Sequence, residues 1–280
     1  MKIKNFYYKV NAFFIYIGSC YRKLSLPDRI SVVYCGVNTE HFRPRLPELS
    51  VKKEFNIPVD AKVVSIVARL SAIKNHKMFL RAARNICTCR KDIYFLVVGP
   101  SVTSDYGDRD NAGNPLDNME VLKKLAQEYG ISDNVIFTGP RRDIREILSI
   151  TDVYAMTSWN EGLNNSVLEA MSSGKPIVAA AVGGMRETFE EGKSGYFVTS
   201  DDDRAMAAKI VTLMDDPQQR KSFGDAARQR AVEVFSIPAM MERNEQIYRR
   251  AALGYWSLWN LFRTGYAFKS IMKSLSRKDV

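Results

Sequence analysis

Short apolar segments alternate with helix-like segments over most of this chain, and no other feature of the sequence restricts the fold as strongly. The apolar segments are rich in β-branched residues and lie at 62–68, 93–98, 135–138, 153–156, 177–180 and 195–198. They lack the regular alternation of a half-exposed strand, which indicates strands buried on both faces of a parallel sheet. The sequence therefore predicts an α/β fold, in which a Rossmann-like parallel sheet has helices on both faces.

Segments with helical spacing fill the gaps between these strands. We expect helices at 78–87, 117–129, 143–149 and 165–173, and C-terminal helices at about 202–214, 218–235 and 238–253. The polar, Gly- and Asp-rich residues 101–114 favour a mobile loop. Ligands of doubly wound folds bind outside the carboxyl ends of the strands. The loops at that edge begin at Arg69, Gly99, Gly139, Thr157 and Ala181.

Composition narrows the classes of function. The chain has 280 residues, 46% of them hydrophobic, and a formal net charge of +10, which suits phosphorylated molecules, anionic membranes or other polyanions. Its basic residues are dispersed and match no nucleic-acid-binding motif, so we expect no nucleic-acid partner. The four cysteines form no CxxC pair and there are two histidines, so we expect neither a zinc site nor disulfides.

The segment from Glu161 to Glu169 carries the strongest functional pattern. It lies between a predicted strand and a predicted helix, and a Gly-Leu-Asn-Asn-Ser run separates its two carboxylates. Backbone N–H groups at such a helix start can bind phosphate. Glu161 precedes the helix and can accept bonds from sugar hydroxyls, whereas Glu169 lies one to two turns inside and can bind a ribose diol. Alternatively, these are an acid at a helix N-terminus and an exposed helical carboxylate.

Two cations follow the first strand. Arg69 and Lys74 lie at a strand's carboxyl end, where both can reach one diphosphate, the arginine by bidentate contact and the lysine as a point charge. Solvated surface cations are the alternative, and the helix start near Glu161 favours the phosphate interpretation. Arg141 can form the rim of a base pocket, and the Gly183-Gly184 pair allows close backbone approach to a ligand or an ordinary turn.

Taken together, these residues resemble a known family. The chain is similar to the C-terminal, donor-binding half of a retaining GT-B glycosyltransferase of the family-4-like group, from about residue 30 to about residue 247. The pieces that carry this resemblance are Gly36–Phe42, Ala68–Leu70 with Lys74, Phe137–Gly139, Glu161 and Glu169 with Ala170-Met171, Gly174–Pro176, and Gly183-Gly184 with Glu187.

The resemblance implies roles for individual residues. Arg69 and Lys74 would bind the diphosphate of a nucleotide sugar and stabilise the leaving group, and Glu161 would contact the transferred sugar. Glu169 would hold the ribose. Backbone N–H groups of the run of residues Gly162, Leu163, Asn164, Asn165 and Ser166 would contact sugar and phosphate. The resemblance implies hexosyl transfer with retention, without a metal or other cofactor, in polysaccharide biosynthesis at the cell envelope.

The same resemblance shapes the expected domains and partners. Family members carry a complete N-terminal acceptor domain, and we expect residues 1–43 to be a remnant of it plus a linker, 44–235 the nucleotide-sugar domain, and 236–280 C-terminal helices with a basic, aromatic tail. We therefore expect a truncated or split enzyme that needs another polypeptide to supply the acceptor half. The acceptor would be a glycan or a lipid-linked molecule. A noncatalytic nucleotide-sugar-binding or assembly subunit is the alternative.

The location of the protein follows from two segments. No apolar run is long enough to span a membrane, and a cytoplasmic chain is the simplest interpretation. Residues 255–273 are aromatic and basic with a roughly helical period, so they can lie at the inner membrane surface or pack on a protein domain. The basic and then apolar residues 1–17 resemble a short signal peptide, but Asn11 interrupts the apolar part.

Overall fold

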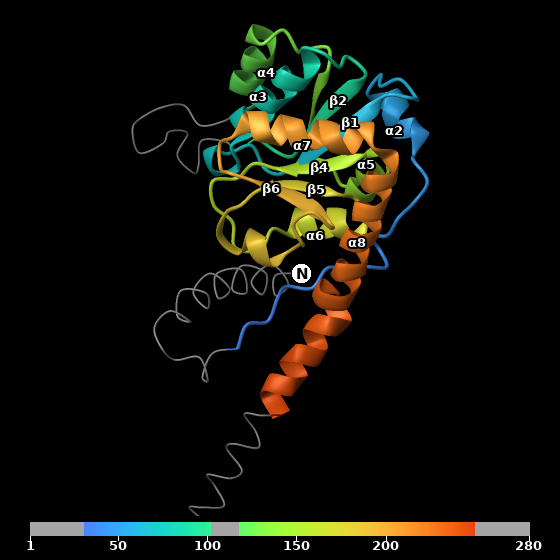
Figure 1. Ribbon diagram of the computed structural model, residues 1–280, viewed down its shortest axis with the longest axis vertical. Coiled ribbons are helices and arrows are strands. Elements are labelled where there is room, and N and C mark those ends of the chain that lie inside the picture. Colours follow the sequence, from blue (N-terminus) through green and yellow to red (C-terminus); the bar gives the residue numbers. More distant parts are fainter. Residues whose placement is uncertain (1–30, 102–117, 250–280) are drawn as a thin grey trace, which may run out of the picture.

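The computed structural model describes residues 31–101 and 118–249. Six strands form one sheet in the order β3-β2-β1-β4-β5-β6, and every neighbouring pair is parallel. The strands are β1 (Lys62–Val67), β2 (Ile93–Val98), β3 (Val135–Gly139), β4 (Val153–Met156), β5 (Ile177–Ala180) and β6 (Gly195–Val198). The predicted α/β fold with its parallel sheet is confirmed (Figure 1).

Helices connect the strands and continue beyond the sheet. They are α2 (Leu49–Glu54), α3 (His76–Cys87), α4 (Met119–Glu128), α5 (Ile144–Ile150), α6 (Asn165–Ser172), α7 (Asp203–Asp215) and α8 (Pro217–Phe235), with short 3-10 turns η2 (Ala72–Lys74) and η4 (Gly183–Glu187). Residues 237–249 are also helical. Most predicted segments are therefore right to within two residues. The predicted 101–114 loop lies almost wholly outside the described residues.

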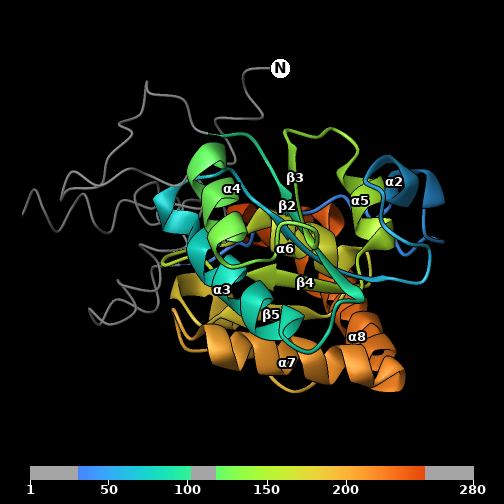
Figure 2. The same ribbon diagram turned by 90° about the horizontal axis from the view of Figure 1, so that it is seen from above.

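Alternate side chains of each strand pack on opposite faces of the sheet. In β1, Val64 and Ile66 join a core with α3, α4 and α7, whereas Val63 joins a core with α2 and α5 on the other face. Tyr154 and Met156 of β4 likewise pack against α6 and α8. Figures 1 and 2 show α7 beside α3, with helices on both faces of the sheet. Burial on both faces explains why the strands lack polar–apolar alternation.

The first described residues pack against the last described helices. The backbone N–H of Val37 donates to Phe235 O at 2.7 Å, and Tyr34 Oη donates to Glu187 at 2.7 Å. The ring of Tyr34 also makes an edge-on contact with that of Phe235. Segments from opposite ends of the chain therefore close one side of the fold. Across residues 31–101 and 118–249, no helix is both long and apolar enough to cross a bilayer.

Candidate functional site

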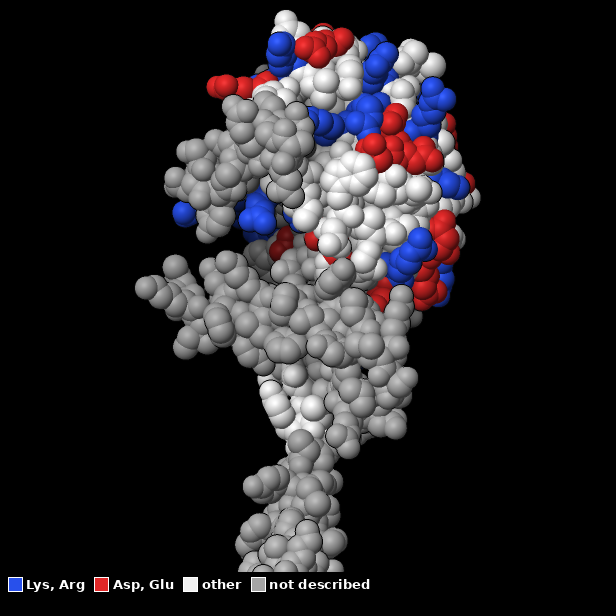
Figure 3. All heavy atoms as spheres, turned by 90° about the vertical axis from the view of Figure 1, so that its left-hand side faces the viewer, with Lys and Arg blue, Asp and Glu red and all other residues white. Residues whose placement is uncertain are grey.

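Two predicted site residues meet between β1 and β4, the point at which the strand order of the sheet reverses. Lys74 lies in the loop after β1 and Glu161 in the loop after β4, and β1 and β4 are neighbouring parallel strands. Lys74 Nζ lies 2.5 Å from Glu161 Oε1, and the two side chains are 18% and 10% exposed. This is the point in a doubly wound sheet at which ligands bind. Figure 3 shows this side of the molecule, with both basic and acidic side chains on its surface.

Backbone contacts fix the two loops against each other. Trp159 N–H donates to Ile73 O at 2.9 Å, and Thr157 Oγ1 donates to Lys74 O at 2.9 Å. The Lys74 ammonium therefore starts from an anchored backbone. Such preorganisation lowers the free-energy cost of binding a charged ligand.

The Glu161 carboxylate is held by three donors from its surroundings. Its Oε1 accepts hydrogen bonds from Lys74, from Ser158 Oγ at 2.7 Å and from Asn164 Nδ2 at 2.9 Å. Among the described residues, Oε2 has no hydrogen-bond partner. One oxygen thus orients the carboxylate, which leaves the second available to accept a hydroxyl from a bound sugar.

The start of α6 is built around Asn164. Its Oδ1 accepts from Ser166 N at 3.0 Å and Val167 N at 3.3 Å, which is the usual N-cap arrangement. The same oxygen accepts from Ser166 Oγ at 2.7 Å, and Tyr154 of β4 contacts that hydroxyl at 2.7 Å. Asn165 follows as an exposed first residue of the helix. A buried strand residue and the cap thus hold the helix end in place.

Leu163 and the Gly183-Gly184 pair complete the surroundings of this loop. The Leu163 side chain is 6% exposed and packs in the core, so only its backbone can contact a ligand. Gly184 N–H donates to Glu161 O at 3.0 Å, and Cβ atoms on Gly183 and Gly184 would lie 2.0 and 2.1 Å from the carbonyl oxygens of Glu161 and Gly162. The absence of side chains at both glycines therefore lets this turn pack directly on the Glu161 loop.

Glu169 lies in a separate recess beside the same helix. It lines a cavity of about 310 Å³ together with Gly36–Asn38, Phe42, Asn165 and Ile237. Burial raises the pKa of the Glu169 carboxyl to about 7. Burial is the main cause that raises the pKa of the Tyr154 hydroxyl, and the charges of Glu169 and Glu161 raise it further. Both carboxylates therefore lie near that hydroxyl. A carboxyl that ionises near neutral pH in a cavity is a candidate for ligand binding.

The two predicted arginines have different surroundings. Arg69 is exposed and makes no ion pair within the described part of the chain, so its guanidinium is available to a ligand. Arg141 contacts Glu54 at 2.5 and 2.9 Å and Asp143 at 2.6 and 2.8 Å, and it lies 5.2 Å from the Phe55 ring centre. Asp143, at the N-cap position of α5, uses its carboxylate for this contact and makes no capping hydrogen bond. Arg141 can reach a nucleotide base only if these contacts rearrange.

Sequence reasoning missed several residues of the site. Tyr154 and Ser158 support the Glu161 loop, and Trp159, 49% exposed, lies two residues before Glu161. Tyr154 lies in an otherwise apolar strand, and its hydroxyl group was the one feature of the sequence that could have indicated a polar role. Since its partners come from β1 and α6, the need for that hydroxyl becomes visible only in three dimensions.

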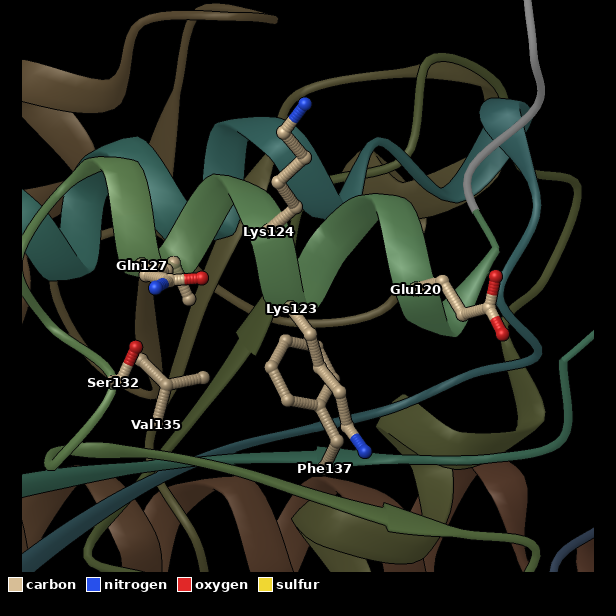
Figure 4. A pocket seen from close by; sticks show the side chains of 8 residues that line it. Glu120, Lys123, Lys124, Gln127, Ser132, Val135 and Phe137 are labelled. Atoms are coloured by element: carbon tan, nitrogen blue, oxygen red, sulfur yellow. The ribbon is translucent and has the colours of Figure 1, made fainter.

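A second hollow lies away from these residues. Side chains of α4 and β3 line a groove of about 580 Å³, with Phe137 and Val135 on the strand and Lys123 and Gln127 on the helix (Figure 4). None of the predicted site residues lines it. The candidate site is therefore confined to the loops after β1 and β4, the start of α6 and the Glu169 recess.

Comparison with known proteins identifies the family. The model of the family described as Glycosyl transferases group 1 matches residues 49–230, which is more than half of the chain. The chain belongs to this family. The resemblance to the C-terminal half of retaining, family-4 GT-B glycosyltransferases is confirmed, and the matched range contains Arg69, Lys74, Glu161 and Glu169.

Curated relatives cover the chain well but extend beyond it. It is 32% identical over 232 residues to the D-inositol 3-phosphate glycosyltransferase of Thermobispora bispora, covering 80% of the chain and 51% of the relative. It is 34% identical over 228 residues to the enzyme of that name from Corynebacterium urealyticum, covering 79% and 51%. The chain thus spans about half the length of these relatives.

Solved structures support the fold. The C-terminal domain of a Glycosyl Transferase Group 1 family protein, LpcC of Francisella tularensis, superposes with a TM-score of 0.61 at 21% identity, covering 72% of this chain and 100% of that domain. Anabaena Alr3699/HepE, solved with UDP-glucose, gives a TM-score of 0.67 at 24% identity and covers 79% and 57%. The predicted GT-B C-terminal domain is therefore confirmed as the fold.

Proposed function

We propose that this chain is the sugar-donor half of a retaining hexosyltransferase that uses a nucleotide diphosphate sugar. The observation that carries the proposal is the Lys74–Glu161 pair at 2.5 Å, set beside the start of α6 at the carboxyl edge of the sheet. Curated relatives at 32% and 34% identity are named glycosyltransferases, which supports the reaction class. A neighbour solved with UDP-glucose supports a nucleotide sugar as the ligand.

Transfer from a diphosphate builds negative charge on the departing oxygen. Exposed Arg69 and anchored Lys74 provide two cations for this charge, and Lys74 can shift from Glu161 to the leaving phosphate. Glu161 then keeps its bonds from Ser158 and Asn164 and can hold the transferred sugar. The N–H groups at the start of α6 add a positive dipole end. In this scheme Gly162–Ser166 contact phosphate and sugar, and Glu169 holds the ribose.

We further propose that transfer needs an acceptor-binding half beside this donor half, with a glycan or lipid-linked acceptor in cell-envelope polysaccharide synthesis. The domain boundaries are part of this proposal: the nucleotide-sugar domain comprises residues 44–235, between an N-terminal segment that ends at residue 43 and a C-terminal segment that begins at residue 236. A noncatalytic nucleotide-sugar-binding or assembly subunit is the second candidate, because the arrangement of Lys74, Glu161 and the start of α6 would also serve binding without turnover. The two candidates differ in whether a reconstituted complex loses turnover when Lys74 or Glu161 is replaced.

Nucleotide binding is the first test. The purified chain is titrated with UDP, GDP and ADP by calorimetry, beside Lys74→Ala and beside Lys124→Ala as a control on an exposed helical lysine. We expect one nucleotide to bind, with affinity reduced at least about tenfold by Lys74→Ala and unchanged by Lys124→Ala. Failure of all three nucleotides to bind, or equal affinity in the two variants, would contradict the proposal.

We also propose that the protein works on the cytoplasmic side and attaches peripherally to the membrane through its C-terminal tail. The basic, aromatic segment 255–273 supports this, and it lies outside the described residues. Sedimentation with anionic liposomes tests it: the full chain should cosediment, and a chain lacking residues 255–280 should not. Equal sedimentation of both chains would count against attachment by the tail.

A further inference from the structure

A further polar cavity, distinct from the groove of α4 and β3, lies at the edge of the sheet opposite the sugar-donor site. Its volume is about 400 Å³, and residues just before β1, β4 and β5 line it together with the end of α5. In Figure 1 this amino edge is on the side of α2 and α5. One strand length, roughly 20 Å, separates it from the loops that carry Lys74 and Glu161. We call it the amino-edge pocket.

The first notable residue of the amino-edge pocket is a buried lysine. Lys52 is 7% exposed, and its Nζ donates to Val59 O at 2.6 Å and Ala61 O at 2.7 Å. No carboxylate of the described residues lies within ion-pairing distance of this ammonium. Burial lowers the pKa of Lys52, against partial opposing effects of Asp152 and Asp60. Buried charges are normally paired, because their desolvation is costly.

A second lysine shares this cavity. Lys175 Nζ donates to Ser149 O at 3.3 Å, and within the described ranges it has no other hydrogen-bond partner and no ion pair. Two of its three N–H donors therefore lack a protein acceptor. Burial lowers the pKa of Lys175 to about 8. Asp152 partly opposes this shift, and Arg220 adds to it. Two ammonium groups without carboxylate partners thus face one cavity.

Other charged groups around the pocket leave it positive. The carboxylate of Asp152 is shared by Lys62 at 3.5 Å and Arg220 at 3.6 Å, and that of Glu146 is used by Arg45 at 3.2 Å. Asp60 also lines the pocket. The charged residues that line the pocket are four cations, Arg45, Lys52, Lys62 and Lys175, and two carboxylates, Asp60 and Asp152. The excess of two positive charges matches a dianion.

We propose that the amino-edge pocket binds a small phosphate monoester, whose dianionic phosphate pairs with Lys52 and Lys175. The phosphate oxygens would accept hydrogen bonds from the spare N–H groups and compensate the charges of buried Lys52 and half-buried Lys175, which no neutral ligand could do. The cavity falls within the range of small-molecule sites, about 300–1,000 Å³, so there is room for the organic part of the ligand. The pocket shares no residue with the site around Lys74, and its occupation does not depend on the proposed transferase activity.

Calorimetric titration at constant ionic strength tests this site, with glycerol 3-phosphate and inorganic phosphate as probes. We expect glycerol 3-phosphate to bind the wild-type chain and the Lys74→Ala variant equally, and at least about tenfold more weakly to Lys175→Met. Lys175→Arg should retain binding because it keeps the charge, and Lys124→Met is a matched surface control that should not change it. Weaker binding of inorganic phosphate would show that the organic part contributes.

Three results would overturn the proposal. The first is that neither probe binds saturably. The second is that Lys74→Ala loses binding while Lys175→Met keeps it. The third is that Lys124→Met loses as much affinity as Lys175→Met. Proton uptake gives an independent measurement that needs no variant of Lys52, which also supports the backbone of residues 59–61. At pH 8.5, phosphate binding should raise the pKa of Lys175 and take up protons, as measured in buffers of different ionisation enthalpy. Absence of uptake by the wild-type chain would also contradict the proposal.

Discussion

The hydroxyl of Tyr154 lies 2.7 Å from Ser166 Oγ, so that the buried strand β4 supports the first turn of α6. The same hydroxyl contacts the backbone of Val67 at 3.2 and 3.3 Å, at the end of the neighbouring strand β1. One side chain therefore links the two strands whose loops carry Lys74 and Glu161. The positions of the two loops that form the candidate site therefore depend on Tyr154, which lies beneath them.

Replacing Tyr154 with Phe should weaken this support. We expect a loss of about 1–2 kcal/mol in the free energy of unfolding, because partly buried Ser166 and Val67 lose a hydrogen-bond partner, and a severalfold loss in nucleotide affinity. Urea denaturation and calorimetry measure the two effects. Tyr94→Phe is the control, since the described residues offer its hydroxyl no hydrogen bond, and an equal effect in both variants would remove the special role of Tyr154.

The Lys74–Glu161 pair should show strong energetic coupling. In a double-mutant cycle with Lys74→Met and Glu161→Gln, we expect a coupling energy of about 1–3 kcal/mol in urea denaturation, because both side chains are largely buried. The exposed Lys124–Glu128 pair, at 4.0 Å, should give less than about 0.5 kcal/mol. Additive single effects at Lys74 and Glu161 would show that the two charges do not interact in solution.

Glu169 predicts a pH dependence of nucleotide binding. Its carboxyl has a pKa of about 7, so it is mostly protonated at pH 6 and mostly ionised at pH 8. If ribose hydroxyls donate to the ionised form, affinity should rise by up to about tenfold over this interval. Titrations of wild type and Glu169→Gln at both pH values separate this effect from ionisation of the nucleotide phosphate. Parallel pH profiles of the two proteins would rule out the predicted role.

His76 predicts a loss of stability in acid. Burial, and secondarily Lys74, lower the pKa of His76 from 6.5 to about 4, and neither ring nitrogen has a hydrogen-bond partner in the described structure. The unfolded chain binds more protons than the folded chain between these values, so this contribution is present above pH 6.5 and is lost as the pH falls through that interval. At pH 5 the loss should be about 2 kcal/mol.

Chemical denaturation of His76→Leu at pH 5 and pH 8 measures this contribution. The variant should gain stability relative to wild type at pH 5 and differ little at pH 8, because leucine removes the unpaired polar group and fills a similar volume. His41→Leu, at an exposed position, should leave the pH dependence unchanged. The explanation fails if wild type and His76→Leu lose the same stability between pH 8 and pH 5.

Local patterns in the sequence determined the elements and most candidates for the site. Apolar strands, helical spacing and the Glu161–Glu169 segment predicted a parallel α/β fold and a phosphate-binding helix start, and α6 begins at Asn165 as predicted. The sequence could not show the use of particular groups. The Gly183-Gly184 pair packs closely on the backbone of the Glu161 loop, and Leu163 turns its side chain into the core.

Only the tertiary structure decided which of these residues meet. Lys74 and Glu161 are 87 positions apart, and they pair because β4 lies beside β1, an order set by packing on both faces of the sheet. The same packing engages Arg141 with two carboxylates and brings Lys52 and Lys175 to one cavity. Residue spacing specifies local hydrogen bonding and burial, whereas strand order depends on contacts between segments far apart in the chain.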